Sequence, residues 1–243
     1  MHARITQVVG ALLNEGFSSI VQETPLKQYA PWHARILLSH PKNPTLSLSR
    51  ALQTLGGGFI PLAHVLSTLS GETTFKNVQD KTAIPHSYVI AAVQREHGAA
   101  HVKTLDASPT HVDSLTQTHT CTLTDGTRAA ITIIKPNAEH AILRDVPVVR
   151  WLANALDTHP YISLLKPRMI ARTFEEHVKR ELDLRTKLSP GSPSLHRQLT
   201  TRRVLLSHPL DAAVRSTGTT RDELAIPALV QRRIRDGNVR VEM

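Results

Sequence analysis

The sequence predicts an α+β fold, and three patterns support this class. Apolar residues recur at spacings of three and four over residues 5–21, as in an amphipathic helix. Over residues 102–134 the period changes to two and β-branched residues become frequent, as in antiparallel strands. Helical spacing then returns over residues 138–156 and 167–188. The expected order is therefore helices, a β-ribbon, helices, a short strand and a last helix.

The breaks between these elements follow from glycine and proline. Three glycines at 56–58 and Pro61 interrupt a helical pattern over residues 46–69, so a break or kink is expected there. Residues 85–98 predict a short helix that begins at a proline and ends at a glycine. Asp125-Gly126 predicts a hairpin, with both residues at positive φ in a type I′ turn. A strand is expected at residues 203–206, and an arginine-rich helix at 220–235 follows a break at residues 189–193.

Composition narrows the class of protein. The chain has 243 residues, 40% of them apolar, which is enough for a sizeable core. The single cysteine, Cys121, excludes an internal disulfide framework. No apolar stretch approaches the ~20 residues of a spanning helix, and the amino terminus lacks a signal-peptide pattern, so a cytoplasmic protein is expected. The formal net charge of +9 favours anionic partners, but the carboxyl-terminal arginines are not interleaved with aromatic residues, which does not favour nucleic acid.

Local motifs alone predict no active site. His97 and His101 are four residues apart, but no third ligand has metal-site spacing, so no metal is expected. There is no P-loop or nucleophile-elbow motif. Cys121 lies within a predicted strand, where a small half-buried residue is a better interpretation than a nucleophile.

Three segments resemble the UbiB/ADCK (AarF-type) family of atypical protein-kinase-like proteins, which act in ubiquinone (coenzyme Q) biosynthesis. Residues 51–68 are similar to a family helix of the form LGxxFxKxGQxLST. Residues 105–136 are similar to a nucleotide-loop hairpin of the form FDxxPxAxASIGQVHxAxLxDGxxVAVKVxRP, and residues 181–185 match the ELDFR signature. The resemblance implies a protein-kinase-like N-terminal lobe over residues 99–211, preceded by the family's helical extension over residues 1–98.

The resemblance also locates substitutions at the positions that do kinase chemistry. The strand lysine that holds the phosphates and its partner glutamate correspond here to Thr132 and Lys187. Lys135 is three residues further along, on the opposite face and displaced by ~10 Å, so it is a poor substitute. The KxGQ positions read Pro61-Leu-Ala-His64. Asp113 lies where the triphosphate would be, and its charge argues against tight ATP binding.

The matching family positions that survive are Ser114, Gln117, His119, Asp125, Gly126, Glu181 and Asp183. Of these, the resemblance implies a vestigial nucleotide site at Ser114, Gln117, Glu181 and Asp183. Each has an alternative interpretation. Ser114 and Gln117 could be ordinary polar residues of a hairpin. Glu181 and Asp183 could form the solvated side of a charged helix. ATP and magnesium are implied by the resemblance alone, and we expect no bound cofactor.

At the carboxyl end, residues 203–211 resemble the family's linker strand and residues 235–243 resemble the start of its catalytic loop. We therefore expect residues 212–243 to begin a truncated C-lobe helix and the catalytic C-lobe to be absent. This predicts a pseudokinase without phosphotransfer. The alternatives are a scaffold that joins ubiquinone-biosynthesis proteins or an anionic membrane surface through its basic face and first helix, peripheral to the inner membrane, and a non-functional relic of a shortened gene.

Overall fold

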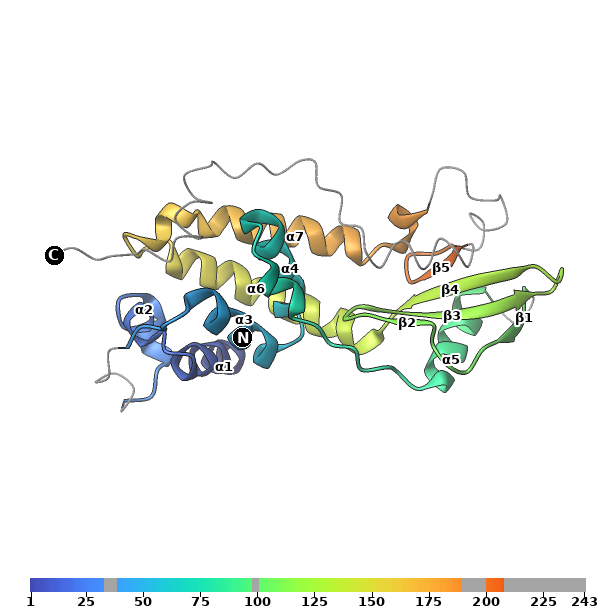
Figure 1. The fold of residues 1–243 in the computed structure, drawn as a ribbon, viewed down its shortest axis with the longest axis horizontal. Coiled ribbons are helices and arrows are strands. Elements are labelled where there is room, and N and C mark those ends of the chain that lie inside the picture. The colour runs from blue at the N-terminus through green and yellow to red at the C-terminus, as the bar shows by residue number, and fades with distance from the viewer. Residues whose placement is uncertain (33–38, 98–100, 189–199, 208–243) are drawn as a thin grey trace. The chain divides into compact units, whose positions relative to one another are not determined.

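The computed structural model describes residues 1–32, 39–97, 101–188 and 200–207 (Figure 1). They form two compact units. The first comprises Met1–Gln79 and Ala141–His177, and the second comprises Asp80–His140 and the described part of Val178–Thr220. The predicted break at 189–193 and helix at 220–235 lie outside the described residues.

The first unit is helical. Its elements are α1 (His2–Asn14), α2 (Ser18–Gln22), η1 (Pro25–Tyr29), α3 (Pro44–Leu55), α4 (Phe59–Ser70), η3 (Thr73–Asn77), η4 (Ile162–Leu165) and most of α6 (Pro136–Leu156) and α7 (Pro167–Glu181). Within the described part of the chain, no helix is both long and apolar enough to cross a bilayer.

The predicted single helix over residues 5–21 is two helices. Gly16 adopts φ +88°, a left-handed conformation that ends α1 and lets the chain turn into α2. The predicted apolar face is nevertheless real, because Ile5, Val8 and Val9 are buried inside the unit. The amphipathic pattern thus predicts the buried face, whereas the helix end at Gly16 differs from the prediction.

A buried ion pair joins the helices of this unit. The Asp145 carboxylate, on α6, accepts hydrogen bonds from Arg4 Nε at 2.9 Å and Arg4 Nη2 at 2.8 Å. It also accepts the Gly58 N–H at 3.0 Å, while Arg4 donates to the Leu55 carbonyl at 2.8 Å. Asp145 is completely buried, so these donors compensate the cost of removing its charge from water.

The predicted break at the three glycines is confirmed and has a packing reason. Gly56 and Gly57 both adopt φ +56°, between the end of α3 and the start of α4. A Cβ on Gly58 would lie 2.7 Å from Asp145 Cβ, so only glycine allows the turn to approach α6 this closely. Pro61 does not break α4, because it lies in the first turn, where its missing N–H has no helical partner.

The second unit contains an antiparallel sheet and one covering helix, which confirms the predicted α+β class. Its elements are α5 (His86–His97), β1 (Val102–Leu105), β2 (His111–Val112), β3 (Thr116–Leu123), β4 (Arg128–Ile134), η5 (Leu184–Lys187) and β5 (Val204–Ser207). The strand order is β1-β3-β4-β5, with β2 also paired to β3. The predicted ribbon and the predicted strand near 203–206 are both present.

Alternation along the strands gives the sheet two different faces. Val89 and Val93 of α5 pack on a core that includes Cys121 and Leu123 of β3, with Ile131, Ile133, Val204 and Leu206 from the neighbouring strands. In Figure 1, α5 lies behind the β3–β4 hairpin. The other face carries a row of threonines, which we call the threonine face: Thr116, Thr118, Thr120 and Thr122 on β3 and Thr132 on β4.

The hairpin is at the predicted position but its turn type was wrong. Gly126 has φ +87°, whereas Asp125 does not have a positive φ. The Gly126 N–H bonds to the Leu123 carbonyl at 3.0 Å, so Thr124 and Asp125 are the central residues of the turn. The Asp125 carboxylate accepts the Thr127 N–H at 2.8 Å. The aspartate therefore acts through its side chain rather than through an unusual backbone conformation.

The predicted helix over residues 167–188 is shorter than expected. It ends at Glu181, and η5 follows as a separate turn in which the Asp183 side chain accepts the Arg185 N–H. Residues 181–187, which carry the family signature, are therefore at a helix end rather than within a helix.

We expect the Asp145→Ala variant to lower the free energy of unfolding by about 3–5 kcal/mol, because it leaves the mostly buried Arg4 side chain and the Gly58 N–H without their acceptor. Urea unfolding followed by circular dichroism would measure this change. The matched control is Glu176→Ala, which removes an exposed partner of Arg172 and should change stability by less than about 0.5 kcal/mol. Equal effects of the two substitutions would contradict a structural role for the buried pair.

Candidate functional site

Thr132, the predicted counterpart of the kinase lysine, is one member of a threonine pair. Thr132 lies directly opposite Thr118 in the β3–β4 register, and their hydroxyl oxygens are 2.8 Å apart. Thr118 is buried and Thr132 is half-buried. The Thr132 side chain is thus uncharged, and its hydroxyl is held by a neutral hydrogen bond to Thr118.

Lys187, the predicted counterpart of the partner glutamate, is a cation that is paired with a carboxylate. Lys187 Nζ, at the end of η5, lies 2.6 Å from Glu181 Oε2, at the end of α7. Both side chains are about one-third exposed, so the pair is only partly screened by water. The Glu181 carboxylate is close enough to neutralise the Lys187 charge.

Asp113 makes hydrogen bonds within the nucleotide-loop segment. Its Oδ1 atom accepts the Leu115 N–H at 2.8 Å and the Thr116 N–H at 2.6 Å, and its Oδ2 atom accepts the Thr116 hydroxyl at 2.7 Å. Successive backbone N–H groups of this kind are the donors that a phosphate would need. In this loop they are used by the protein's own carboxylate.

Ser114 and Gln117 both contact the segment at residues 80–84, which precedes α5. The Ser114 hydroxyl accepts the Asp80 N–H at 2.9 Å. The Gln117 amide accepts the Ile84 N–H at 2.8 Å and donates to the Ile84 carbonyl at 3.2 Å, much as a neighbouring strand would. Gln117 is fully buried, on the face of the sheet opposite Thr132.

Lys135 contacts the same segment. It follows β4, and its ammonium group donates to the carbonyls of Thr82 at 3.0 Å and Asp80 at 3.4 Å. Burial lowers the pKa of the Lys135 ammonium, while the nearby charges of Asp80 and Asp113 oppose that shift. The prediction that Lys135 does not replace the strand lysine agrees with these contacts, since its side chain binds residues 80–82.

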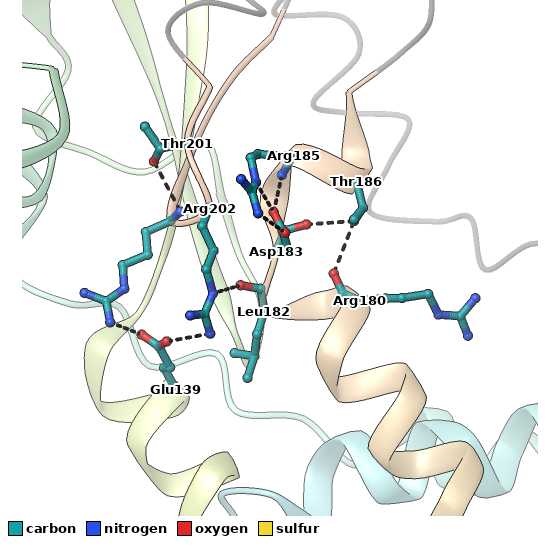
Figure 2. A network of polar contacts seen from close by, with 9 residues as sticks. Glu139, Arg180, Leu182, Asp183, Arg185, Thr186, Thr201 and Arg202 are labelled. Carbon is teal, nitrogen blue, oxygen red and sulfur yellow. Dashed lines mark hydrogen bonds and ion pairs between the residues drawn. The ribbon is translucent and has the colours of Figure 1, made fainter.

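Asp183 belongs to a polar network around the end of α7 (Figure 2). Its carboxylate binds the Arg185 guanidinium through two hydrogen bonds, of 2.9 and 2.6 Å. These hydrogen bonds hold the pKa of the Asp183 carboxyl below its ordinary value. Arg185 is the only charged side chain shown bound to Asp183 in Figure 2.

The described contacts place the four predicted site residues in two groups. Ser114 and Gln117 bind residues 80–84, whereas Glu181 and Asp183 bind side chains of η5. Each of the four therefore has a partner within the protein, and the assignment of these residues to a nucleotide remains a prediction.

Sequence reasoning missed the residues that hold the end of α7 against β5. Glu139, buried in the first turn of α6, accepts from Arg202 at 3.3 Å and pairs with Arg203 at 3.1 Å. Arg202 also donates to the Leu182 carbonyl at 3.1 Å (Figure 2). The Arg202 carbonyl accepts the Leu184 N–H. Glu139 and Arg202 are 63 positions apart, so no local pattern could have paired them.

A second missed feature is a buried polar cluster beneath α5. His119 is fully buried, its Nδ1 lies 2.8 Å from the Asp106 carbonyl, and its Nε2 lies 2.8 Å from the Gln117 amide. The His86 ring packs at 5.8 Å, centroid to centroid. Burial lowers the pKa of His119, and the neighbouring His86 adds to this shift, whereas the hydrogen bond to Asp106 opposes it.

Comparison with known proteins gives a family match that includes residues of both units. Residues 78–187 match the family described as ABC1 atypical kinase-like domain. This match, together with the antiparallel sheet and helix α5, confirms the predicted kinase-like N-terminal lobe.

The most informative relatives carry the name "Probable protein kinase UbiB". The protein from Xylella fastidiosa strain M12 is 28% identical over 151 residues, which are 56% of this chain and 27% of the relative. Those from Shewanella frigidimarina and Marinobacter nauticus are 27% and 26% identical, over 62% and 70% of this chain and 30% and 33% of their own length. The chain is thus related to the UbiB/ADCK family, and the match spans about a third or less of these curated relatives.

We expect the Cys121 thiol to be unreactive in the folded protein. It is buried in the sheet core, and burial raises its pKa to about 11, so on the order of 0.1% is thiolate at pH 8. Ellman's reagent should react slowly in native buffer and at once in concentrated urea. Because Cys121 is the sole cysteine, fast stoichiometric reaction in native buffer would contradict this burial directly.

We expect acid to destabilise the second unit through His119. Its pKa is lowered on folding, so the unfolded chain takes up a proton below pH ~6.5 that the folded chain does not. The free energy of unfolding should therefore fall as the pH falls below ~6.5, by up to about 1.4 kcal/mol per pH unit for this group. Unfolding of wild type and His119→Gln between pH 7.5 and pH 5 would measure the slope, with exposed His140→Gln as the matched control.

The expected result is a shallower slope for His119→Gln alone. If His119→Gln does not fold, histidine NMR of the wild type still decides the question, because one imidazole should remain neutral at a pH where exposed histidines are charged. Equal slopes for both variants, or titration of every imidazole near pH 6.5, would contradict the prediction.

Proposed function

We propose that this chain acts as a pseudokinase-type binding module of ubiquinone biosynthesis, without phosphotransfer. The main support is that Thr132 and Lys187 replace both members of the kinase lysine–glutamate pair and that each has a partner within the protein. The pathway assignment rests on relatedness to UbiB proteins.

The substituted pair supports this proposal through charge. Kinases gather the α- and β-phosphates around a fixed lysine held by a helix glutamate. Thr132 supplies no charge, and its hydroxyl is bonded to Thr118. Lys187 has the opposite sign from the glutamate and is paired with Glu181. A triphosphate bound at this sheet in the kinase manner would thus lack its principal cation.

The loop supports the same proposal through hydrogen bonding. The N–H groups of Leu115 and Thr116 already donate to the Asp113 carboxylate. A phosphate would have to displace that carboxylate and also lie next to its charge. These residues do not fit a nucleotide held in the kinase manner, so we derive no catalytic step through ATP or magnesium.

The proposal predicts that ATP with magnesium does not stabilise the chain. A ligand that binds only the folded state raises its melting temperature, by an amount that grows with concentration over Kd. We expect no shift at about 1 mM ATP for wild type or for Thr132→Lys, since a single lysine restores neither its partner nor the loop donors. A UbiB relative, measured alongside, is the positive control for the assay.

Two outcomes would contradict the proposal. One is a concentration-dependent rise in the wild-type melting temperature. The other is ATP turnover by the purified chain that Glu181→Ala abolishes, because this would place Glu181 in a working nucleotide site. Deletion of the gene tests the pathway separately, because the ubiquinone level of the cell should then fall. Expression of the Thr132→Val variant should restore that level, because the proposal assigns no catalytic step to the Thr132 hydroxyl.

A further inference from the structure

The segment that leads into α5 is attached to the sheet through the side-chain amide of Gln117. Its Oε1 atom accepts the Ile84 N–H at 2.8 Å, and its Nε2 atom donates to the Ile84 carbonyl at 3.2 Å. A backbone N–H can only donate, so this contact fixes which end of the amide is the oxygen. The Nε2 atom of Gln117 also lies 2.8 Å from His119 Nε2. One amide therefore joins Ile84 to His119, and it cannot turn over without losing both bonds to Ile84.

These contacts also fix the tautomer of His119. Its Nδ1 atom lies 2.8 Å from the Asp106 carbonyl, which can only accept, so Nδ1 carries the hydrogen of the neutral ring. Its Nε2 atom must then be the acceptor, which agrees with the amide group that Gln117 presents to it. A second proton can bind only at Nε2, where it would meet the N–H groups of Gln117.

An independent observation comes from His86, the first residue of α5. Its Nε2 atom is buried and has no hydrogen-bond partner among the residues that the structure describes. The His86 ring lies beside that of His119, with 5.8 Å between the centroids. A buried polar atom without a partner destabilises the state in which it is buried. Movement of the first turn of α5 into water would relieve this cost.

The groups that surround His119 do not offer an acceptor for a second proton. From α5 the neighbour is His86, whose charge opposes a charge on His119. On the same face of the sheet the neighbours are Cys121 on β3 and the apolar Ile131, directly opposite on β4. The Asp106 carboxylate favours the charged ring, but Asp106 is exposed, so water screens its charge. The oxygen of the neighbouring amide is therefore the acceptor that a charged His119 requires.

We propose that acid releases residues 83–86, which include the first residue of α5, from the sheet while β3 and β4 stay folded. The protonated Nε2 of His119 requires an oxygen, so the Gln117 amide turns over and accepts a charge-assisted hydrogen bond. The turned amide then presents its NH₂ group to the Ile84 N–H and its oxygen to the Ile84 carbonyl. Both bonds to Ile84 are lost, because donors face donors and acceptors face acceptors.

The release is limited on both sides by contacts that do not titrate with His119. Ser114 and Lys135 hold residues 80–82 through backbone groups, so this part of the segment stays attached. Val89, one turn into α5, is buried in the apolar core of the sheet and keeps the rest of the helix in place. The inference concerns the attachment of α5 and makes no use of a nucleotide.

Amide hydrogen exchange of the full chain tests the proposal. The protection factor compares the exchange rate of an amide with its rate in an unstructured peptide at the same pH. Because the released form binds one more proton, the protection factor of the Ile84 amide should fall by up to about tenfold per pH unit below pH ~6.5. The amides of Ile131 and Ile133, within β4, should remain better protected than Ile84 at every pH down to pH 5.

Three variants separate this mechanism from a general effect of acid. His119→Gln cannot take up the proton, so protection of Ile84 should no longer depend on pH, whereas the exposed control His140→Gln should behave as the wild type. The carboxylate of Gln117→Glu can accept from Ile84 and from a charged His119 together, so Ile84 should stay protected at pH 5. His86→Phe removes the unpartnered nitrogen and should raise the Ile84 protection factor at pH 7 by at least about fivefold.

Constant protection of Ile84 in the wild type between pH 7.5 and pH 5, or an equal fall in His119→Gln, would overturn the proposal. So would a fall in which Ile84 and Ile133 reach the same protection factor, because the whole unit would then be unfolding. Nitrogen NMR of the wild-type histidines decides the question if the variants do not fold. A neutral His119 with its hydrogen on Nε2 would contradict the mechanism, because the Gln117 amide would then not exclude a proton from that atom.

Discussion

The register between β3 and β4 is the constraint on which the second unit depends. Because side chains alternate along a strand, one pairing fixes the role of every residue on both strands. Thr132 opposite Thr118 places that pair on the threonine face, and the neighbouring positions, Gln117 and Ile133, fall on the face that α5 covers. A slip by one residue would turn the apolar side chains of β4 away from α5. The position of Thr132 on the threonine face is therefore fixed by the same pairing that forms the core.

The first unit depends on a different kind of interaction, a buried charge that must be satisfied. Asp145 binds Arg4 and the Gly58 N–H, which brings α1, the α3–α4 turn and α6 to one point. This requirement explains the glycines better than helix breaking does, because a side chain at Gly58 would displace the carboxylate. Glu139 plays a comparable role in the second unit, where Arg202 and Arg203 converge on it. In both cases one buried carboxylate orders segments that are distant in sequence.

The features predictable from the sequence were those with a local cause. Strand alternation located the ribbon and β5, and the glycines located the break before α4. The unpredicted features depend on contacts between distant segments. Asp113 was interpreted as a charge that would repel a triphosphate, but its hydrogen bonds to Leu115 and Thr116 depend on the fold of the loop. Helix α7 likewise ends at Glu181, next to the Glu181–Lys187 ion pair and the hydrogen bond from Arg202 to the Leu182 carbonyl. The spacing of apolar residues along a helix does not predict such contacts.

The substituted residues in the kinase-like unit share one property: each has a hydrogen-bond or ion-pair partner within the protein. Removing only the strand lysine would leave a helix carboxylate without its counter-ion, and an unpaired, partly buried charge is costly. Here position 187 has also changed, and its lysine neutralises Glu181 at 2.6 Å. Thr132 has a matching hydroxyl in Thr118, and the loop N–H groups have an acceptor in Asp113. Each of these groups thus has a partner within the protein, so substituting any one of them would break an existing hydrogen bond or ion pair.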